Sequence, residues 1–252
     1  MYDFQLQKEM LDISLALLEE RGVKADCALG GGTALSAYYW QHRFSTDIDI
    51  FIHNGTKEDL NRIDPRRTSA GIKVQLKKIN YRGDLKKHPI YTELAIDDDS
   101  KMQFFVVKGH TTIPYSKVIL WNKQIFVESI EEIIAKKVYY RCEDANTRDL
   151  FDLAVAIYKD PSILMSINVA KEKLEKLLVS VETIAESKEL TNTYKLEIKM
   201  MSPAAEYTDI AMNCITYLNT FLSNYLSALN QRMPNMKEFC EELQEYSYSK
   251  IF

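Results

Sequence analysis

The chain has 252 residues, of which 46% are hydrophobic and 27% are charged, and its formal net charge is −4. This composition is ordinary for a globular protein, and the length suffices for one large domain or two modest ones. The four cysteines show no CxxC spacing, so we interpret them as reduced, mostly buried thiols rather than a disulfide or zinc framework.

Neither the N-terminus nor the uncharged stretch 210–231 has the pattern of a membrane segment. The N-terminal residues carry charges throughout and lack the apolar core of a signal peptide. Four asparagines interrupt the uncharged stretch, which favours a buried helix over a membrane span. We therefore expect a cytoplasmic protein with no membrane partner.

In chain order, the first half predicts alternating helices and strands around a sheet of about five strands. An amphipathic helix precedes a short buried strand, a glycine turn and a second helix, and a strand of alternating isoleucines follows. The predicted helices are 2–21, 33–40 and 57–62, and the predicted strands are 23–29, 46–53, 71–80, 90–96, 101–107, 118–120 and 125–127.

From Ser129 onward the hydrophobic pattern becomes helical. Prolines fall between the helical segments, where they interrupt no hydrogen bonds. The predicted helices are 133–142, 147–158, 163–180, 181–187, 204–229 and 236–246. We therefore predict two domains, an α/β domain over 1–128 and a helical bundle over 129–252.

Three of the eight glycines stand together at positions 30–32, directly before Thr33. Free N–H groups at a glycine-rich helix start can bind an anion, and a threonine hydroxyl can add a further contact. The structural alternative is a tight strand-to-helix turn that requires a positive φ. The glycines alone do not separate these two interpretations.

Asp47 and Asp49 alternate with isoleucines in the strand predicted at 46–53. Because side chains two residues apart lie on one face of a strand, both carboxylates point the same way. Mg²⁺ usually binds one or two carboxylates together with substrate phosphates. Two close carboxylates repel each other unless a cation offsets their charge. Together with the glycine turn, this pair predicts a site for a phosphate and a divalent metal.

A third charged group occurs in the helices predicted from residue 133 onward. Arg148 and Asp152 are four residues apart, the spacing of a helix ion pair worth a few tenths of a kcal/mol. Asp149 lies on the same side of the helix as Asp152, so one of the two carboxylates is left for another role. Lys136 and Lys137 are adjacent, so their side chains point about 100° apart on a helix, and only one of them is expected to face a site.

A basic run lies between Arg62 and Lys87. It carries nine lysines and arginines against only Asp64 and Asp84. Such a run could meet a polyphosphate or an RNA backbone. The more frequent alternative is a solvated face that has no partner.

Several common enzyme classes are not indicated. The four histidines show no metal-ligand spacing, and we expect His42 to lie in an exposed loop. The sequence has no Gly-x-Ser-x-Gly, GxxxxGK[ST] or HExxH motif. This argues against α/β-hydrolases, P-loop NTPases and zincins.

Four stretches resemble the AbiEii family of nucleotidyltransferase-like toxins: GGTALS, HRFSTDIDIF, EEIIAKKVYYR and RDLFDL. They occur in the family's order between Leu29 and Leu153, and the C-terminal helices carry no recognisable motif. Members of this family are toxins of abortive-infection toxin–antitoxin systems and are related to the MenT toxins. The resemblance implies an α+β chain, with a minimal nucleotidyltransferase fold of the polymerase-β type followed by an all-α bundle.

The resemblance further implies transfer of an NMP from an NTP, with Mg²⁺ or Mn²⁺, to an RNA (tRNA-like) or protein acceptor. A cognate antitoxin protein is the implied partner. By position, Asp47 and Asp49 bind the metal, Lys137 contacts the triphosphate, and Asp149 orients the acceptor or the lysine. The residues implied in nucleotide binding are Gly31, Gly32, Thr33, Ser36, Arg43, Ser45, Arg148 and Asp152.

One departure from the family pattern bears on catalysis. Polymerase-β-type enzymes use a third carboxylate on a neighbouring strand, but the strand at 101–107 has only Gln103 as a polar interior residue. Either Asp149 or a residue such as Glu93 substitutes, or the chemistry is weak or lost. The alternative function is a catalytically degenerate protein that binds a nucleotide or a partner protein. A further alternative is a DxD glycosyl- or phosphotransferase, but that function would not explain Lys137 or the RDLFDL stretch.

Overall fold

The computed structural model describes residues 2–144 and 146–251, which form two compact units. The first, here called the sheet unit, comprises Met1–Gln41, Ser45–Gly109 and Tyr115–Ser129. The second, here called the helical unit, comprises His42–Phe44, His110–Pro114 and Ile130–Phe252. Two short segments from the first half of the chain thus belong to the helical unit.

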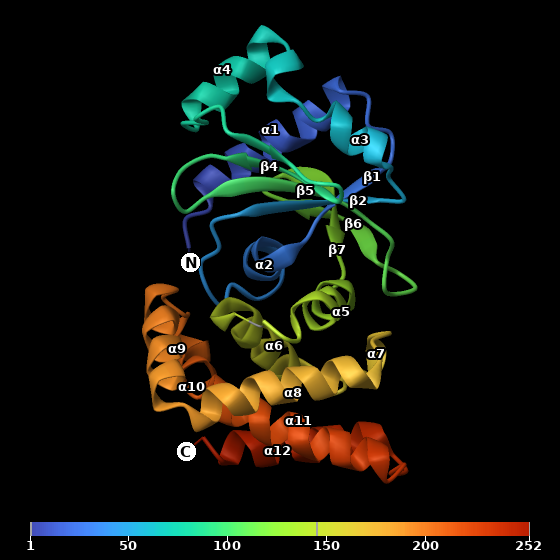
Figure 1. Cartoon of the computed structure of the whole chain (residues 1–252), viewed down its shortest axis with the longest axis vertical. Coiled ribbons are helices and arrows are strands. Elements are labelled where there is room, and N and C mark those ends of the chain that lie inside the picture. The colour runs from blue at the N-terminus through green and yellow to red at the C-terminus, as the bar shows by residue number, and fades with distance from the viewer. Residues whose placement is uncertain (1, 145, 252) are drawn as a thin grey trace. The chain divides into compact units, whose positions relative to one another are not determined.

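Among the described residues, the sheet unit contains one mixed sheet of seven strands in the order β3-β4-β5-β2-β1-β7-β6 (Figure 1). β2 is parallel to β5 and β1 is parallel to β7, whereas the other neighbours are antiparallel. The strands are β1 (Asp26–Leu29), β2 (Ile48–His53), β3 (Leu85–Lys87), β4 (Tyr91–Ala95), β5 (Lys101–Val107), β6 (Tyr115–Leu120) and β7 (Lys123–Glu128).

One face of the sheet is apolar and packs against helices. Ile48, Ile50 and Ile52 of β2 are fully buried, and the Ser14 hydroxyl contacts Met102 Sδ from the helix side. Figure 1 shows these helices together on this side of the sheet. They are α1 (Gln5–Glu20), α3 (Lys57–Arg62) and α4 (Ala70–Lys78), with the 3₁₀ turn η2 (Pro65–Arg67) between the last two. The opposite face therefore remains for the polar side chains of β2.

On that opposite face, the chain turns from β1 directly into α2 (Gly31–Ala34), which continues as the π-helical segment η1 (Leu35–Trp40). Figure 1 shows α2 across the sheet from α1, α3 and α4. The turn thereby lies on the face of β2 that carries Asp49.

The helical unit is built around α11 (Cys214–Asn230), which packs against α6 (Thr147–Lys159), α8 (Lys171–Glu186) and α12 (Met236–Ser249). Leu218, Phe221 and Leu222 of α11 are fully buried, as expected for apolar residues that recur at helical spacing. The remaining elements are α5 (Ile130–Arg141), α7 (Ile163–Ser166), α9 (Lys188–Met200), η3 (Ala205–Tyr207) and α10 (Thr208–Met212). Among the helices of the described residues, none is long and apolar enough to cross a membrane.

The predicted strand at 71–80 is wrong, because this segment forms α4. Ile72, Val74 and Leu76 fit the period of a strand, but Ile72, Leu76 and Ile79 are buried while Val74 is 53% exposed, which is the pattern of a helix. Ser69 caps the helix by accepting a hydrogen bond from the Ile72 N–H. The sheet also has seven strands rather than about five, because β3 and the longer β6–β7 hairpin add to it. The helix α9 was not predicted.

Candidate active site

The glycine turn packs directly on Asp49. Gly31 has φ +63°, and a Cβ atom placed on it would lie 2.1 Å from Asp49 Oδ2. The N–H of Gly30 also donates to the Asp49 carbonyl oxygen over 2.9 Å. Both the left-handed backbone and the close approach exclude a side chain at Gly31. The turn therefore helps to place the Asp49 carboxylate.

A second carboxylate lies against the other side of this turn. A Cβ atom on Gly30 would lie 2.2 Å from Glu128 Oε2 and 2.5 Å from the Phe51 ring. Glu128 Oε1 is 2.8 Å from His53 Nε2, and both side chains are buried. Sequence reasoning missed this pair, because β7 and β1 become neighbours only through tertiary pairing.

Buried hydroxyl groups tie the turn to the backbone that leads into β2. Thr33 Oγ1 is 2.9 Å from Ser45 Oγ and also contacts the Asp47 carbonyl oxygen. Both residues are almost fully buried, and Ser36 is completely buried on η1. These side chains fix the geometry around Asp47. Whether they also contact a nucleotide stays a prediction.

Asp49 begins a row of polar side chains that crosses four strands. Strand register places Asp49 beside Gln103, Gln103 beside Glu93, and Glu93 beside Lys86. Gln103 Nε2 donates to Glu93 Oε2 over 2.9 Å, and Lys86 Nζ lies 2.8 Å from Glu93 Oε1. Because an ionised carboxylate only accepts hydrogen bonds, Gln103 presents its amino group to Glu93 and its Oε1 to the other side.

The donor set of this face suits a hard divalent cation. Asp47 Oδ1 accepts the Lys101 N–H over 3.2 Å, so the backbone of β5 orients this carboxylate. Mg²⁺ is usually bound by one or two carboxylates together with water and substrate phosphates. Among the described residues, no group of three or more His, Cys, Asp or Glu is arranged to hold a metal. Metal binding by Asp47 and Asp49 stays a prediction.

We expect Gly31→Ala to lower the nucleotidyl transfer that the family resemblance implies by roughly 10- to 100-fold, because its Cβ displaces the Asp49 carboxylate. Gly83→Ala is the matched control, since Gly83 has φ +91° and nothing lies within 4 Å of an added Cβ. Both variants should lose about 1–2 kcal/mol of unfolding free energy from backbone strain. Urea unfolding and transfer rates would be measured together. Equal activity of the two variants would show that the turn does not position Asp49.

The helical unit holds a second, buried cluster of charges around Asp152 on α6. Arg43 makes a bidentate pair with Asp152, with Nε 2.7 Å from Oδ1 and Nη2 2.9 Å from Oδ2. Lys137 Nζ of α5 lies 3.0 Å from Asp152 Oδ2 and 2.5 Å from Asp149 Oδ1. Both aspartates thus contact Lys137, and Asn146 caps α6 so that Asp149 lies in its first turn.

The electrostatics of this cluster fix its protonation. Burial alone would raise the pKa of Asp152, but the charges of Arg43 and Lys137 hold it well below its usual range. Burial likewise opposes charge on Lys137, yet the carboxylates of Asp149 and Asp152 raise its pKa above normal. Both ions therefore stay charged at neutral pH.

His42 lies in this cluster, not in an exposed loop as predicted. Its side chain is fully buried, and Nε2 is 2.7 Å from Asp152 Oδ1. Burial lowers its pKa, although Asp152 acts in the opposite direction. The imidazole is therefore neutral at pH 7. No sequence signal indicated the contact, because the two residues are 110 positions apart.

The remaining predicted residue of this group, Arg148, is exposed on α6. The structure thus divides the predicted site residues between the units. Asp47, Asp49 and the turn residues belong to the sheet unit. Lys137, Asp149, Asp152, Arg43 and Arg148 belong to the helical unit.

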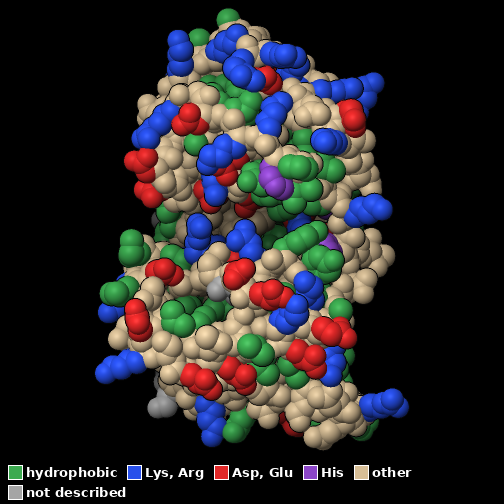
Figure 2. Space-filling view, viewed as in Figure 1, with side chains coloured by type: hydrophobic (Ala, Val, Ile, Leu, Met, Phe, Trp, Pro, Cys, Tyr) green, Lys and Arg blue, Asp and Glu red, His purple; other side chains and the backbone are tan. Residues whose placement is uncertain are grey.

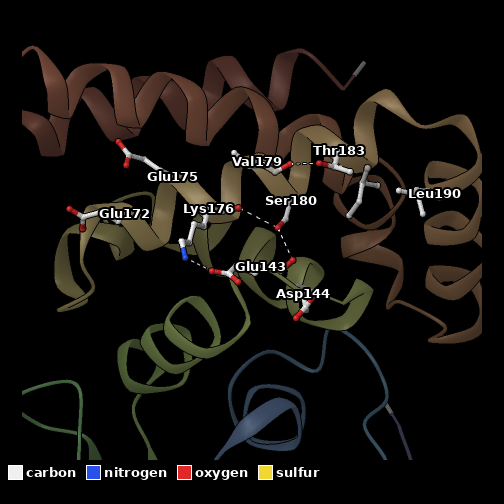
Figure 3. A pocket seen from close by; sticks show the side chains of 10 residues that line it. Glu143, Asp144, Glu172, Glu175, Lys176, Val179, Ser180, Thr183 and Leu190 are labelled. Carbon is white, nitrogen blue, oxygen red and sulfur yellow. Dashed lines mark hydrogen bonds and ion pairs between the residues drawn. The ribbon is translucent and has the colours of Figure 1, made fainter.

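A separate groove of about 830 Å³ lies along α8 in the helical unit (Figure 3). Its walls carry several carboxylates, and Ser180 Oγ donates to the Cys142 carbonyl oxygen over 2.7 Å at its floor. Lys176 forms an ion pair with Glu143 across it. None of the predicted site residues lines this groove.

The basic run of the sequence forms α4 and its flanking segments, and all nine of its basic side chains are exposed. Figure 2 shows lysine and arginine side chains gathered over α4. Four of the nine form ion pairs, since Arg66 and Arg67 pair with Asp64, Arg82 with Asp98, and Lys86 with Glu93. The surface is therefore positive, and a partner for it stays a prediction.

A model of the family described as "Nucleotidyl transferase AbiEii toxin, Type IV TA system" matches residues 15–220. The chain belongs to the AbiEii family. This confirms the resemblance drawn from the four sequence stretches, and it makes the AbiEii chain a member of a family of nucleotidyltransferase toxins. Comparison with curated proteins gives no match.

Two solved structures are similar to the AbiEii chain over most of its length. JHP933 from Helicobacter pylori is 17% identical with a TM-score of 0.51, and the match covers 92% of this chain and 96% of that one. A putative nucleotidyltransferase from H. pylori is 16% identical with a TM-score of 0.51, over 92% and 99% of the two chains. Similarity at this identity shows the fold, and the predicted α+β class with a nucleotidyltransferase-type sheet is confirmed.

Proposed function

We propose that this AbiEii chain is a Mg²⁺-dependent nucleotidyltransferase that moves an NMP from an NTP to a hydroxyl of an RNA or protein acceptor. It would act as the toxin of a pair with a cognate antitoxin protein. The observation that carries the proposal is the contact between the glycine turn and Asp49. It brings backbone N–H groups, which suit phosphates, next to a carboxylate that suits a metal.

In this reaction the acceptor oxygen forms a bond to the α-phosphorus of the NTP. The bond from that phosphorus to the bridging oxygen of the pyrophosphate breaks, and pyrophosphate and a proton leave. A bound Mg²⁺ would polarise the phosphate and neutralise charge on the leaving group. The protein's own task is to position the reactants and their charges.

The residues divide this task in the following way. Asp47 and Asp49 would hold the metal, and the N–H groups of the turn would face the triphosphate. The family pattern assigns Lys137 to the triphosphate and Asp149 to orienting the acceptor or the lysine. The bidentate bond of Arg43 to Asp152 suits a positioning role, because it fixes the carboxylate that contacts Lys137.

Incubation of the purified chain with α-³²P-labelled NTPs, total RNA and cell lysate tests the proposal. We expect label in an RNA or protein band when Mg²⁺ or Mn²⁺ is present, and loss of that label with EDTA. Restoring the metal should restore the label. Absence of label with every NTP in both metals would contradict nucleotidyl transfer.

The presence of Gln103 in place of an acid favours a second candidate, a degenerate fold that only binds nucleotide. Isothermal titration of NTPs separates the two functions. Binding that persists in EDTA and in Asp47→Ala, without transfer, would support the degenerate protein. Binding that needs both the metal and Asp47 would support the enzyme.

A further inference from the structure

A row of aromatic rings lies beside the polar row of the sheet and is displaced from it by two residues along each strand. Register pairs Phe51 with Phe105 and Phe105 with Tyr91. Just beyond β3, the His88 N–H donates to the Tyr91 carbonyl oxygen over 2.8 Å, and the two rings stack. The two rows are therefore separated by about 6.6 Å, the rise of two strand residues. The aromatic row consists of Phe51, Phe105, Tyr91 and His88.

The rings form a continuous surface. Phe51 and Phe105 stack with centroids 5.1 Å apart, Phe105 and Tyr91 are 5.7 Å apart, and Tyr91 and His88 stack at 4.8 Å. His88 is exposed, and the other three rings are half-buried. On the opposite face of the same strands, Ile50 and Phe104 are fully buried. Aromatic side chains left partly exposed on a sheet face next to a site indicate a binding surface.

The direction of the row indicates which substrate meets it. The glycine turn covers its Phe51 end, since a Cβ on Gly30 would lie 2.5 Å from that ring. From there the row leads across β5 and β4, away from the turn that we propose holds the triphosphate. The His88 end of the row, here called the open end because His88 is exposed, therefore lies farther from the turn than the Phe51 end.

The charges beside the open end suit a nucleic acid. Lys86 lies in the adjacent row, and Lys101 Nζ is 3.8 Å from Glu93 on the same face. Of the basic run, Lys86 is the residue that lies on this face, whereas α4 packs on the opposite face of the sheet. Proteins that bind single-stranded nucleic acid combine such cations with aromatic rings on which bases stack.

We propose that Phe105, Tyr91 and His88 form a stacking platform for unpaired bases at the end of an acceptor RNA. This inference rests on the proposed nucleotidyl transfer and selects RNA over protein as the acceptor. A base on the platform and the reacting hydroxyl near Asp49 would belong to the same short single-stranded end. A fully paired end would not expose its base faces to the rings.

Fluorescence anisotropy in EDTA and without NTP tests the platform independently of catalysis. The probes are a labelled hairpin RNA with a single-stranded 3′ end and the same hairpin with a blunt end. We expect the overhang to increase affinity in the wild type. Tyr91→Leu keeps apolar bulk but loses the planar ring, and should weaken binding of the overhang roughly 5- to 100-fold. Tyr91→Phe should bind like the wild type.

Tyr246→Ala is the control, because Tyr246 is 49% exposed on α12 and lies in the other unit. It should leave RNA binding unchanged. Equal binding of the overhang by Tyr91→Leu and wild type, or a wild-type preference for the blunt end, would overturn the platform. Label found only on protein would also overturn the platform. The same holds if Tyr91→Leu weakens NTP binding but does not weaken RNA binding. Overhang binding that needs Tyr91, together with no NMP transfer, would instead contradict the proposed function and leave the platform standing.

Discussion

Asp152→Asn is expected to lower the unfolding free energy by about 3–5 kcal/mol. The substitution keeps the shape of the side chain but removes its charge. Arg43, which is buried, and Lys137, which is half-buried, then remain as two cations opposite the single carboxylate of Asp149. Since Arg43 is 2% exposed, water cannot compensate for the lost charge. Urea unfolding at neutral pH would measure the loss.

Asp98→Asn is the control for this prediction. Asp98 also pairs with an arginine, Arg82, but their side chains are 85% and 56% exposed. Exposed pairs contribute little to stability, so this variant should unfold like the wild type. If Asp152→Asn were as stable as Asp98→Asn, the cluster in the helical unit would not be a stabilising one.

Asp49→Asn is expected to reduce the rate of nucleotidyl transfer roughly 10³-fold. Loss of a metal ligand removes several kcal/mol of transition-state stabilisation, and each 1.36 kcal/mol is a factor of about ten. The fold should persist, because the amide fits the space that Gly31 leaves beside the carboxylate. Single-turnover rates at saturating Mg²⁺ would be compared for wild type, Asp49→Asn and the Asp98→Asn control.

Titration of Mn²⁺ by electron paramagnetic resonance provides a readout apart from activity. Asp49→Asn should bind the metal more weakly, whereas Asp98→Asn should match the wild type. If Asp49→Asn left both the Mn²⁺ affinity and the transfer rate unchanged, Asp49 would not be part of the metal site.

Local pattern was enough to predict much of the sheet unit. The alternation of Ile48, Ile50 and Ile52 set the faces of β2, so Asp49 could be placed before any tertiary contact was known. The same rule gave β5 its correct bounds. It was wrong for α4, where apolar residues satisfied two periods and only packing decided between them.

Contacts between distant parts of the chain could not be predicted. The neighbours of Gln103 depend on the order of the strands in the sheet, and the sequence of a single strand does not determine that order. The burial of His42 depends on Asp152, which a helix starting more than one hundred residues later supplies. For the same reason, the aromatic row became visible only when the register of β2, β4 and β5 was known.

The bond between Arg43 and Asp152 also has a consequence for the order of folding. During synthesis the arginine is made 109 residues before its partner, and the carboxylate of α6 arrives in a chain that already contains the cation. Closing so long a loop is entropically unfavourable until other contacts have shortened it, and such non-local contacts slow folding. We therefore expect the helical unit to complete its core late, after α6 has been made and the segment His42–Phe44 packs against it.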